Sequence, residues 1–448
     1  MTRRTTKAKE ARTDKLGLSP FSWLEFDAGG GLVDVGAPAA IEAMLAAPGI
    51  TDLVVMSHGW KNTKDDATKL YGTLWSHAAA TLVHKDPKTI AIVGIVWPAK
   101  QFSTDFDDAA AAQSAGGGAL ALDDAAAPDD LSDAEFEKTL AGVKDLLGPA
   151  GDAVVVAARD AAAAITFDTA DALFKKARAA VRSPVGDKEL QKNAQFFDPV
   201  GSPEAVLGSL IRPPQIPAAT DLGHISGLGD AIGNLFRGLR AAVGRVLNQL
   251  TYYEMKTRAG TVGAALGGRV LPASNALTGK RLHLIGHSFG ARLVTAAASA
   301  LPAHPSFDFF SLTLLQGAFS HNGLSSAASG AFANVIGRPS GPISITHTHN
   351  DRANTFWYAL ASRLSNDATQ GFGDADDIFG AMGANGAQKL AAGTIVHDTT
   401  GQAFAPKRGK VNGFLADGYV VEIPGVIEAH NNVTNPTCGK LVAAVLEA

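Results

Sequence analysis

A serine set between two glycines is the strongest chemical signal in this chain. The motif Gly-His-Ser-Phe-Gly occupies residues 286–290 and is the one Gly-x-Ser-x-Gly in the 448 residues. It follows an apolar run at 282–285 and precedes a helical run at 291–294, which gives the strand, tight turn and helix that the motif requires. Backbone N–H groups and the helix dipole at such a turn favour an incipient anion. The pattern therefore predicts that Ser288 is a nucleophile rather than an ordinary helix N-cap.

A serine hydroxyl needs a base to take its proton and a third group to orient that base. Where the nucleophile lies on a strand-turn-helix elbow, the chain order is serine, then acid, then histidine. Asp351 follows an expected strand at 343–346, and His430 follows an expected strand at 419–423. We therefore predict Asp351 as the orienting acid and His430 as the general base. The alternatives are Glu428, Asp398 and Asp417 as acids, and His397, His347 and His349 as bases.

An acyl-transfer site also needs donors for the tetrahedral oxyanion. One is expected from the backbone N–H of Phe289, directly after the nucleophile, and the other from the loop after an early strand. That loop contains His58, Gly59 and Trp60. Gly59 leaves room for the backbone to approach the substrate oxygen, so the N–H of Trp60 is the predicted second donor. His58 and His287 are expected to support the structure rather than the chemistry.

The elements that must position these residues alternate between short apolar runs and helical stretches. This alternation predicts an α/β fold with a doubly wound, mostly parallel sheet. A hairpin over 21–26 and 32–35 is expected to open the domain. The expected strands are 53–56, 90–97, 282–285, 312–315, 343–346 and 419–423, and the expected helices are 38–46, 64–84, 289–301, 353–363 and 436–447.

The composition divides the chain into three parts. Residues 1–20 carry many basic and few apolar side chains and are expected to be a disordered arm. Residues 21–100 and 245–448 form the predicted α/β core. Residues 101–244 form a mainly helical insertion that is predicted to cap the core as a lid. The insertion contains a capping box at Ser132, and a long amphipathic helix follows to about 260.

The net charge, the cysteine content and the length of the apolar segments argue against several classes of protein. The formal net charge is -4, which does not favour nucleic acid as a partner. The single cysteine, Cys438, cannot form an intramolecular disulfide, and no segment reaches about 18 uncharged apolar residues. We therefore expect a cytoplasmic protein without stable membrane insertion. The oligomeric state stays open.

Four features together resemble the α/β-hydrolase superfamily, particularly its bacterial esterase-like, lipase-like and serine-peptidase-like members. They are the segments 55–60, 93–98 and 286–290 and the late acid and histidine. The resemblance covers the predicted core and implies an α/β-hydrolase fold, a Ser288-Asp351-His430 triad, no cofactor and no metal, and hydrolysis of an acyl bond. It does not extend to 101–244, where many members carry a lid that sets specificity. The expected substrate is a small carboxyl ester with an apolar part.

Other functions stay open. The run from His347 through His349 to Asp351 resembles the His-x-His-x-Asp of dinuclear metallo-hydrolases, but Arg352 stands where that motif continues with histidine. The acidic loop at 374–377 lacks the spacing of a calcium-binding EF-hand. A serine peptidase, amidase or acyltransferase would use the same triad. A catalytically silent member of the fold would act as a binding protein.

Overall fold

One sheet runs through the centre of the protein. The computed structural model describes residues 14–60, 62–99, 130–180, 202–211, 238–351, 380–398 and 404–448. Within these residues nine strands pair in the order β1-β2-β4-β3-β5-β6-β7-β9-β8, and only β1 runs antiparallel to its neighbour. The strands are β1 (Asp14–Leu16), β2 (Ser19–Glu25), β3 (Asp52–Ser57), β4 (Ile90–Val96), β5 (Arg281–His287), β6 (Asp308–Leu315), β7 (Ile343–His347), β8 (Ile395–Asp398) and β9 (Val411–Leu415).

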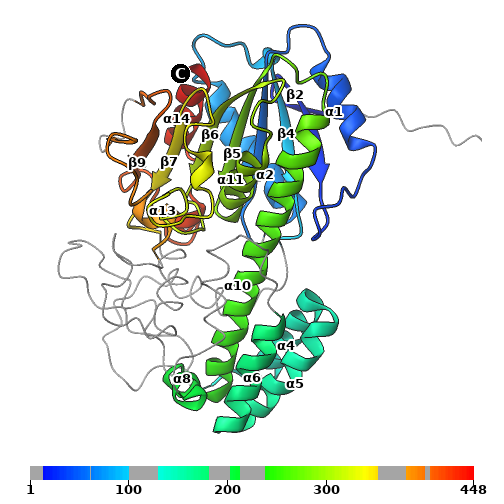
Figure 1. The fold of residues 1–448 in the computed structure, drawn as a ribbon, viewed down its shortest axis with the longest axis vertical. Coiled ribbons are helices and arrows are strands. Elements are labelled where there is room, and N and C mark those ends of the chain that lie inside the picture. Colours follow the sequence, from blue (N-terminus) through cyan, green and yellow to red (C-terminus); the bar gives the residue numbers. More distant parts are fainter. Residues whose placement is uncertain are drawn as a thin grey trace, which may run out of the picture.

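Helices cover both faces of the sheet. On one face α2 (Lys64–Ala79) packs beside α14 (Pro436–Glu447), and on the other α1 (Ala37–Leu45) and α11 (Phe289–Ala300) lie with α10 (Leu239–Ala265) (Figure 1). The central strands are buried on both faces, which is why they read as continuous apolar runs rather than as alternating patterns. The doubly wound α/β architecture predicted from the alternation is confirmed.

The connections of β3 and β5 diverge at the middle of the sheet. From β3 the chain passes through α2 to β4 on one side, and from β5 it passes through α11 to β6 on the other. In open α/β sheets such a reversal opens a crevice outside the carboxyl ends of the two strands, and ligands bind there. Because β3 and β5 are neighbours, the loops that follow them meet at this crevice.

A helical lobe lies between β4 and β5 in the sequence. Its described helices are α4 (Asp133–Leu147), α5 (Pro149–Ala163), α6 (Phe167–Ala180) and α8 (Pro203–Ser209), which lie together at one end of the molecule (Figure 1). The predicted capping box is present, because Ser132 accepts from the N–H of Glu135 and the Glu135 carboxylate accepts from the N–H of Ser132. The apolar stripe of α4, which includes Phe136 and Leu140, is buried as expected.

A single long helix joins this lobe to the core. The 27 residues of α10 span about 40 Å. Its first half packs on α4, α5 and α8, and its second half packs on α11. Arg258 adds a direct link, since its guanidinium donates to the carbonyl of Leu146 in α4 at 2.9 Å. The domain boundary expected at 244/245 therefore falls inside one continuous helix.

The sequence placed the last strand wrongly. Residues 419–423 do not form a strand; they follow β9 in a turn closed by the bond from the N–H of Val420 to the carbonyl of Ala416, 2.8 Å. Val420 is fully buried in the core, which explains the strand-like apolar pattern. The actual strand, β9, contains Asn412 and Gly413, two residue types that strands disfavour. Asn412 is accommodated because its amide donates to three backbone carbonyls.

The start of the chain also differs from expectation. Residues 14–16 were assigned to the arm but form β1, paired with β2, while residues 1–13 lie outside the described part. The second strand expected at 32–35 is reduced to a single bridge between Phe26 and Leu32. The helix expected at 353–363 and the acidic loop at 374–377 also lie outside the described residues.

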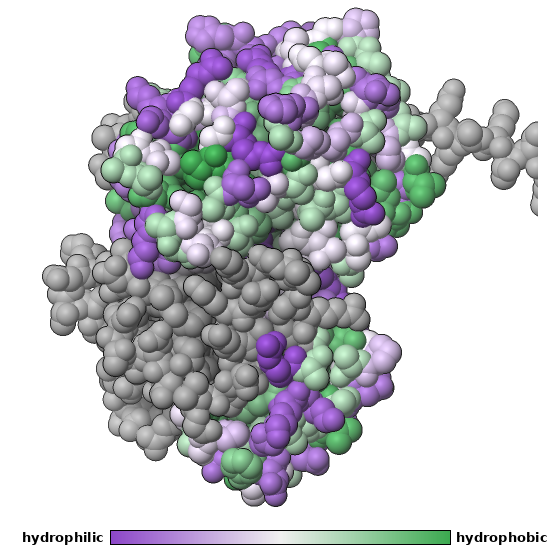
Figure 2. All heavy atoms as spheres, in the orientation of Figure 1, coloured by the Kyte–Doolittle hydropathy of each residue, from purple (hydrophilic) through white to green (hydrophobic). Residues whose placement is uncertain are grey.

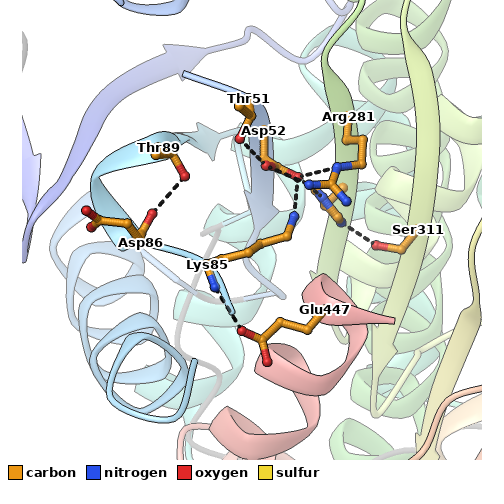
Figure 3. A network of polar contacts seen from close by, with 9 residues as sticks. Thr51, Asp52, Lys85, Asp86, Thr89, Arg281, Ser311 and Glu447 are labelled. Carbon is orange, nitrogen blue, oxygen red and sulfur yellow. Dashed lines mark hydrogen bonds and ion pairs between the residues drawn. The ribbon is translucent and has the colours of Figure 1, made fainter. Parts of the chain in front are cut away.

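A polar network holds the amino edge of the sheet (Figure 3). Asp52, fully buried at the start of β3, accepts from Thr51, Lys85, Arg281 and His283, the last at 2.9 Å. The other ring nitrogen of His283 accepts from the hydroxyl of Ser311 at 2.8 Å. Burial alone would raise the pKa of Asp52, but these hydrogen bonds hold it well below its usual range. This network lies at the opposite edge from the crevice.

Apolar side chains that reach solvent are dispersed over the described surface. Figure 2 shows hydrophobic residues mingled with hydrophilic ones on both the core and the helical lobe. The most exposed include Val35, Val83 and Val426 in the core and Val156 and Phe167 in the lobe. No helix among the described residues combines the length and the apolar character needed to cross a membrane.

Candidate active site

Ser288 lies at the turn between β5 and α11. Its φ is +57° and its ψ is -124°, a backbone conformation that non-glycine residues adopt only under strain. The turn is tight because α11 starts directly over the end of β3: a Cβ on Gly290 would lie 2.2 Å from the carbonyl oxygen of Ser57. The hydroxyl of Ser288 makes no capping bond to the helix. Ser288 therefore does not act as an ordinary N-cap.

The structure brings the three predicted triad residues together. The Oγ of Ser288 lies 2.9 Å from Nε2 of His430, and Nδ1 of His430 lies 2.9 Å and 3.0 Å from the two carboxylate oxygens of Asp351. A carboxylate can only accept, so Nδ1 carries the proton and Nε2 is left to accept from the serine hydroxyl. All three residues are buried. The arrangement is an unbroken hydrogen-bonded chain from carboxylate to hydroxyl.

The protonation of His430 depends on two opposing effects. Burial would lower its pKa, but the charge of Asp351 and the hydrogen bond to it outweigh burial, and the charge of Glu428 adds to them. The pKa of His430 is consequently raised above its ordinary value of 6.5. An imidazole in this setting is a better proton acceptor than a free one, and its cationic form is stabilised by the carboxylate beside it.

His287 also contacts the base, which the sequence did not indicate. A backbone carbonyl can only accept, so the Nε2–H of His287 donates to the carbonyl oxygen of His430 at 2.9 Å. Burial, together with the charge of His430, lowers the pKa of His287 to about 3, so this side chain is neutral. His287, the last residue of β5, therefore connects the backbone of His430 to the strand that precedes Ser288.

The loop after β3 lies against the nucleophile. A Cβ on Gly59 would come within 2.6 Å of the Cβ of Ser288, so only glycine fits there. The carbonyl of Gly59 accepts from Nδ1 of His58 at 2.9 Å and from the amide of Asn62 at 3.3 Å. In a planar trans peptide the N–H of Trp60 points opposite to that carbonyl. These two side chains thereby fix the direction of the predicted second oxyanion donor.

His58 takes part in this loop as a neutral side chain. Burial lowers its pKa to about 4, although the bond to Gly59 and the charge of Asp66 act in the other direction. Its ring stacks on Trp97 at 5.7 Å, and the indole N–H of Trp97 donates to the backbone carbonyl of His58 at 3.1 Å. The expectation that His58 supports the loop agrees with these contacts.

The other predicted donor, the backbone N–H of Phe289, belongs to the first residue of α11. The first N–H groups of a helix have no partner within the helix, so the N–H of Phe289 is placed to bind an anion beside Ser288. The ring of Phe289 packs with those of Tyr252 and Trp60, at 4.9 Å and 6.1 Å between centroids. The ammonium of Lys256 lies 5.6 Å from the ring of Tyr252. A largely buried aromatic cluster, to which α10 contributes Tyr252, thus surrounds the ring of Phe289.

The other candidate acids and bases lie elsewhere. Asp417 pairs with His349 at 2.8 Å, and Glu428 influences His430 only through its charge. His347 is half-buried with its ring near Gly386, and desolvation of the ring lowers its pKa to about 4. The remaining alternatives, His397 and Asp398, lie in the edge strand β8.

The run from His347 to Asp351 does not converge on one point. His349 contacts Asp417, Asp351 contacts His430, and His347 is turned toward Gly386. Across the described ranges, no group of three or more His, Cys, Asp or Glu side chains is arranged to hold a metal ion.

Three side chains hold loops of the site through bonds that the sequence did not indicate. They are His287, which was expected only to support the structure, Asp417, which was an alternative acid, and Asn62, which had no expected role. Each acts through a hydrogen bond to a loop rather than through chemistry of its own. Their positions relative to the motif residues were visible, but their bonding partners depend on the tertiary structure. Compared with protein-family models, with curated proteins and with solved structures, the chain gives no match.

Proposed function

We propose that this protein is a serine hydrolase of the α/β-hydrolase superfamily that cleaves carboxyl esters through an acyl-enzyme. The observation that carries the proposal is the continuous chain from Asp351 through His430 to Ser288, with the serine held at positive φ at a helix N-terminus. Activated nucleophiles are recognised by this combination of nucleophile, base and orienting group within hydrogen-bond reach. The chain order of the three also agrees with that superfamily.

In the proposed cycle, Ser288 Oγ attacks the carbonyl carbon while Nε2 of His430 takes the hydroxyl proton. The negative charge that develops on the carbonyl oxygen is stabilised by the N–H groups of Phe289 and Trp60. When the tetrahedral intermediate collapses, the bond to the alcohol breaks and His430 gives its proton to the departing oxygen. Water, deprotonated by His430, then attacks the acyl carbon. The bond from this carbon to Ser288 Oγ breaks, His430 returns the proton to Oγ, and the carboxylic acid leaves. Asp351 keeps Nδ1 protonated and stabilises the imidazolium throughout.

The proposed substrates are esters with an apolar part. The aromatic side chains of Trp60, Tyr252 and Phe289 beside the nucleophile favour an apolar acyl or alcohol group. Residues 101–244 would act as the cap that covers this group. The attachment of the helical lobe through α10, which also contributes Tyr252 to the aromatic cluster, supports that role.

The direct test is labelling by a fluorophosphonate, followed by turnover of p-nitrophenyl esters of graded chain length. We expect wild-type protein to be labelled at Ser288 and Ser288→Ala to lose labelling, with kcat lowered about 10⁴-fold or more. Ser311→Ala is a matched control, because that serine also contacts a histidine, at 2.8 Å, but is fully buried. Near-native turnover by Ser288→Ala would contradict the proposal. Absence of labelling in the wild type would favour a binding protein.

A further inference from the structure

The turn that follows β9 contacts both loops that carry the acid and the base. This turn, residues 416–421, accepts from the amide of Asn350 through the carbonyl of Val420 at 3.3 Å. It also accepts from the amide of Asn432 through the carbonyl of Val421 at 2.8 Å. Asn350 precedes Asp351 directly, and Asn432 lies two residues after His430. One short turn therefore connects the two loops.

The side chain of Asp417 makes the densest contacts within this turn. One carboxylate oxygen accepts from the hydroxyl of Thr348 at 2.7 Å and from the backbone N–H of His349 at 2.9 Å. The other accepts from Nδ1 of His349 at 2.8 Å. The backbone carbonyl of Asp417 accepts from the amide of Asn350 at 3.1 Å. Three consecutive residues before Asp351 are thus bound to one residue.

The acid loop depends on these bonds because it has left the sheet. β7 ends at His347, four residues before Asp351, and the pairing with β9 continues only through the bond from the N–H of Ala416 to the carbonyl of His347, 2.7 Å. Within the loop, the N–H of Asp351 reaches back to the carbonyl of Thr348 at 3.2 Å. Outside the loop, the N–H of Thr348 donates to the carbonyl of Gly383 at 2.9 Å, and Asp417 supplies further bonds to each of residues 348–350.

Asp417 and His349 each stabilise the charged form of the other. The hydrogen bond to Asp417 raises the pKa of His349, although burial opposes it. Burial would raise the pKa of Asp417, but its bonds to His349 and Thr348 lower it to about 2. Asp417 is consequently an anion wherever the triad could work.

We propose that Asp417 is a positioning residue for Asp351. By holding residues 348–350, it keeps the Asp351 carboxylate within hydrogen-bond distance of Nδ1 of His430. Asp417 touches neither the substrate nor a reacting atom. The inference rests on the proposed function, because it assigns a role within the same triad.

A matched pair of variants separates the hydrogen bonds of Asp417 from its charge. Asp417→Ala removes both carboxylate oxygens and the three hydrogen bonds that they accept. We expect kcat to fall about 10- to 100-fold with KM within about 3-fold, the scale of a misplacement near 1 Å. Asp417→Asn keeps an oxygen for Thr348 and the backbone N–H, and its amide can donate to neutral His349. We expect it to stay within about 3-fold of wild type. Asp86→Ala, which removes a loop-binding carboxylate at the amino edge, is the control (Figure 3).

A second experiment distinguishes positioning from general damage. In an Asp351→Asn background there is no carboxylate left to position, so we expect Asp417→Ala to lower kcat by less than about 3-fold more. Damage to the fold would lower kcat by the same factor in both backgrounds. Equal factors would overturn the inference. Should Asp417→Ala fail to fold, Thr348→Val removes one of the same bonds and carries the same expectation with a smaller effect.

A third measurement does not depend on turnover. The proton between Nδ1 of His430 and Asp351 gives a downfield NMR signal that Asp351→Asn removes. We expect Asp417→Ala to shift or broaden this signal and Asp417→Asn to preserve it. An unchanged signal in Asp417→Ala would reject the inference. A wild-type protein that shows the signal but neither turnover nor labelling would instead reject the proposed function, and the signal would still test Asp417.

Discussion

Two histidines within a few ångströms of Ser288 have pKa values shifted in opposite directions. The rings of His287 and His430 lie 5.0 Å apart, yet the pKa of the first is lowered to about 3 and that of the second is raised. The difference follows from the neighbours, because His430 has a carboxylate partner and His287 faces a backbone carbonyl. Only a histidine paired with a carboxylate combines a basic nitrogen with stabilisation of its cation.

This contrast predicts a specific pH dependence. Activity requires neutral His430, so kcat/KM is expected to rise with pH through an apparent pKa above 6.5. In Asp351→Asn the raising effect of the charge is lost while burial remains, so the apparent pKa is expected to fall and kcat to drop by about 10⁴-fold. The measurement is kcat/KM from pH 5 to 9 for both proteins. An unshifted profile would show that another group is the acid.

At the level of single residues, much of the site could be predicted from the sequence. Ser288, Asp351 and His430 have the expected chain order, and Ser288 and Asp351 follow strands that the pattern indicates. The pattern places His430 after a strand at 419–423 that the structure does not contain, because the strand before it, β9, ends at Leu415. Asp417 was weighed only as a rival acid, because a sequence does not show which carboxylate reaches the histidine. That choice is made by the turn of the chain after β7 and β9, which brings Asp351 rather than Asp417 to His430.

The carboxyl and amino edges of the sheet have different roles. The carboxyl edge carries the candidate site on loops, whereas polar contacts at the amino edge join β3, β5 and α14 (Figure 3). Glu447, at the end of α14, accepts from three consecutive backbone N–H groups at 83–85. Rigid anchoring at one edge suits precise loop positions at the other.

The Asp52 network at the amino edge predicts that Asp52→Asn lowers the stability of the protein. Removing one partner from a buried charge cluster leaves Lys85 and Arg281 uncompensated, so we expect a loss of about 3 kcal/mol in the free energy of unfolding. Because the folded pKa of Asp52 is lowered, its contribution is complete above the ordinary value of 3.8 and is lost as the pH falls further. Denaturant titrations at pH 7 and pH 3 measure this. A larger deficit at pH 3 than at pH 7 would contradict the expectation, and labelling of Ser288 should persist in the folded variant.

Some elements were predictable and others were not, for physical reasons. β3, β4 and β5 are buried on both faces, so their apolar runs are unambiguous. β9 contains Asn412 and Gly413 near the edge of the sheet, where side-chain bonds to the backbone replace apolar packing. A pattern of hydrophobicity cannot reveal such a strand. The buried Val420 in the next turn gave residues 419–423 the apolar pattern of a strand instead.

The whole molecule consists of a core and a helical lobe that share α10. Residues on all sides of this helix are buried, including polar ones such as Asn248 and Lys256. Because its second half packs on α11, which begins directly after Ser288, the lobe is attached to the helix that follows the candidate nucleophile.

This arrangement predicts how removal of the lobe would act. We expect replacement of residues 105–228 by a short Gly-Ser linker to weaken the preference for longer acyl chains in a p-nitrophenyl ester series, because a cap supplies apolar surface for them. The readout is kcat/KM for each ester, with circular dichroism to establish that the shortened protein is folded. A folded protein with an unaltered chain-length preference would show that the lobe is not a cap.

The buried contact between Ser311, His283 and Asp52 has a consequence for how hydrolases are recognised from coordinates. A search template built only on distances between a hydroxyl, an imidazole and a carboxylate would match both this set and the set at Ser288 within the described residues. In the amino-edge set the ring is reversed, with the carboxylate on Nε2, and two cations already neutralise that carboxylate. Such templates need terms for ring orientation, competing cations and backbone strain at the serine, because proximity alone does not separate a scaffold from a catalyst.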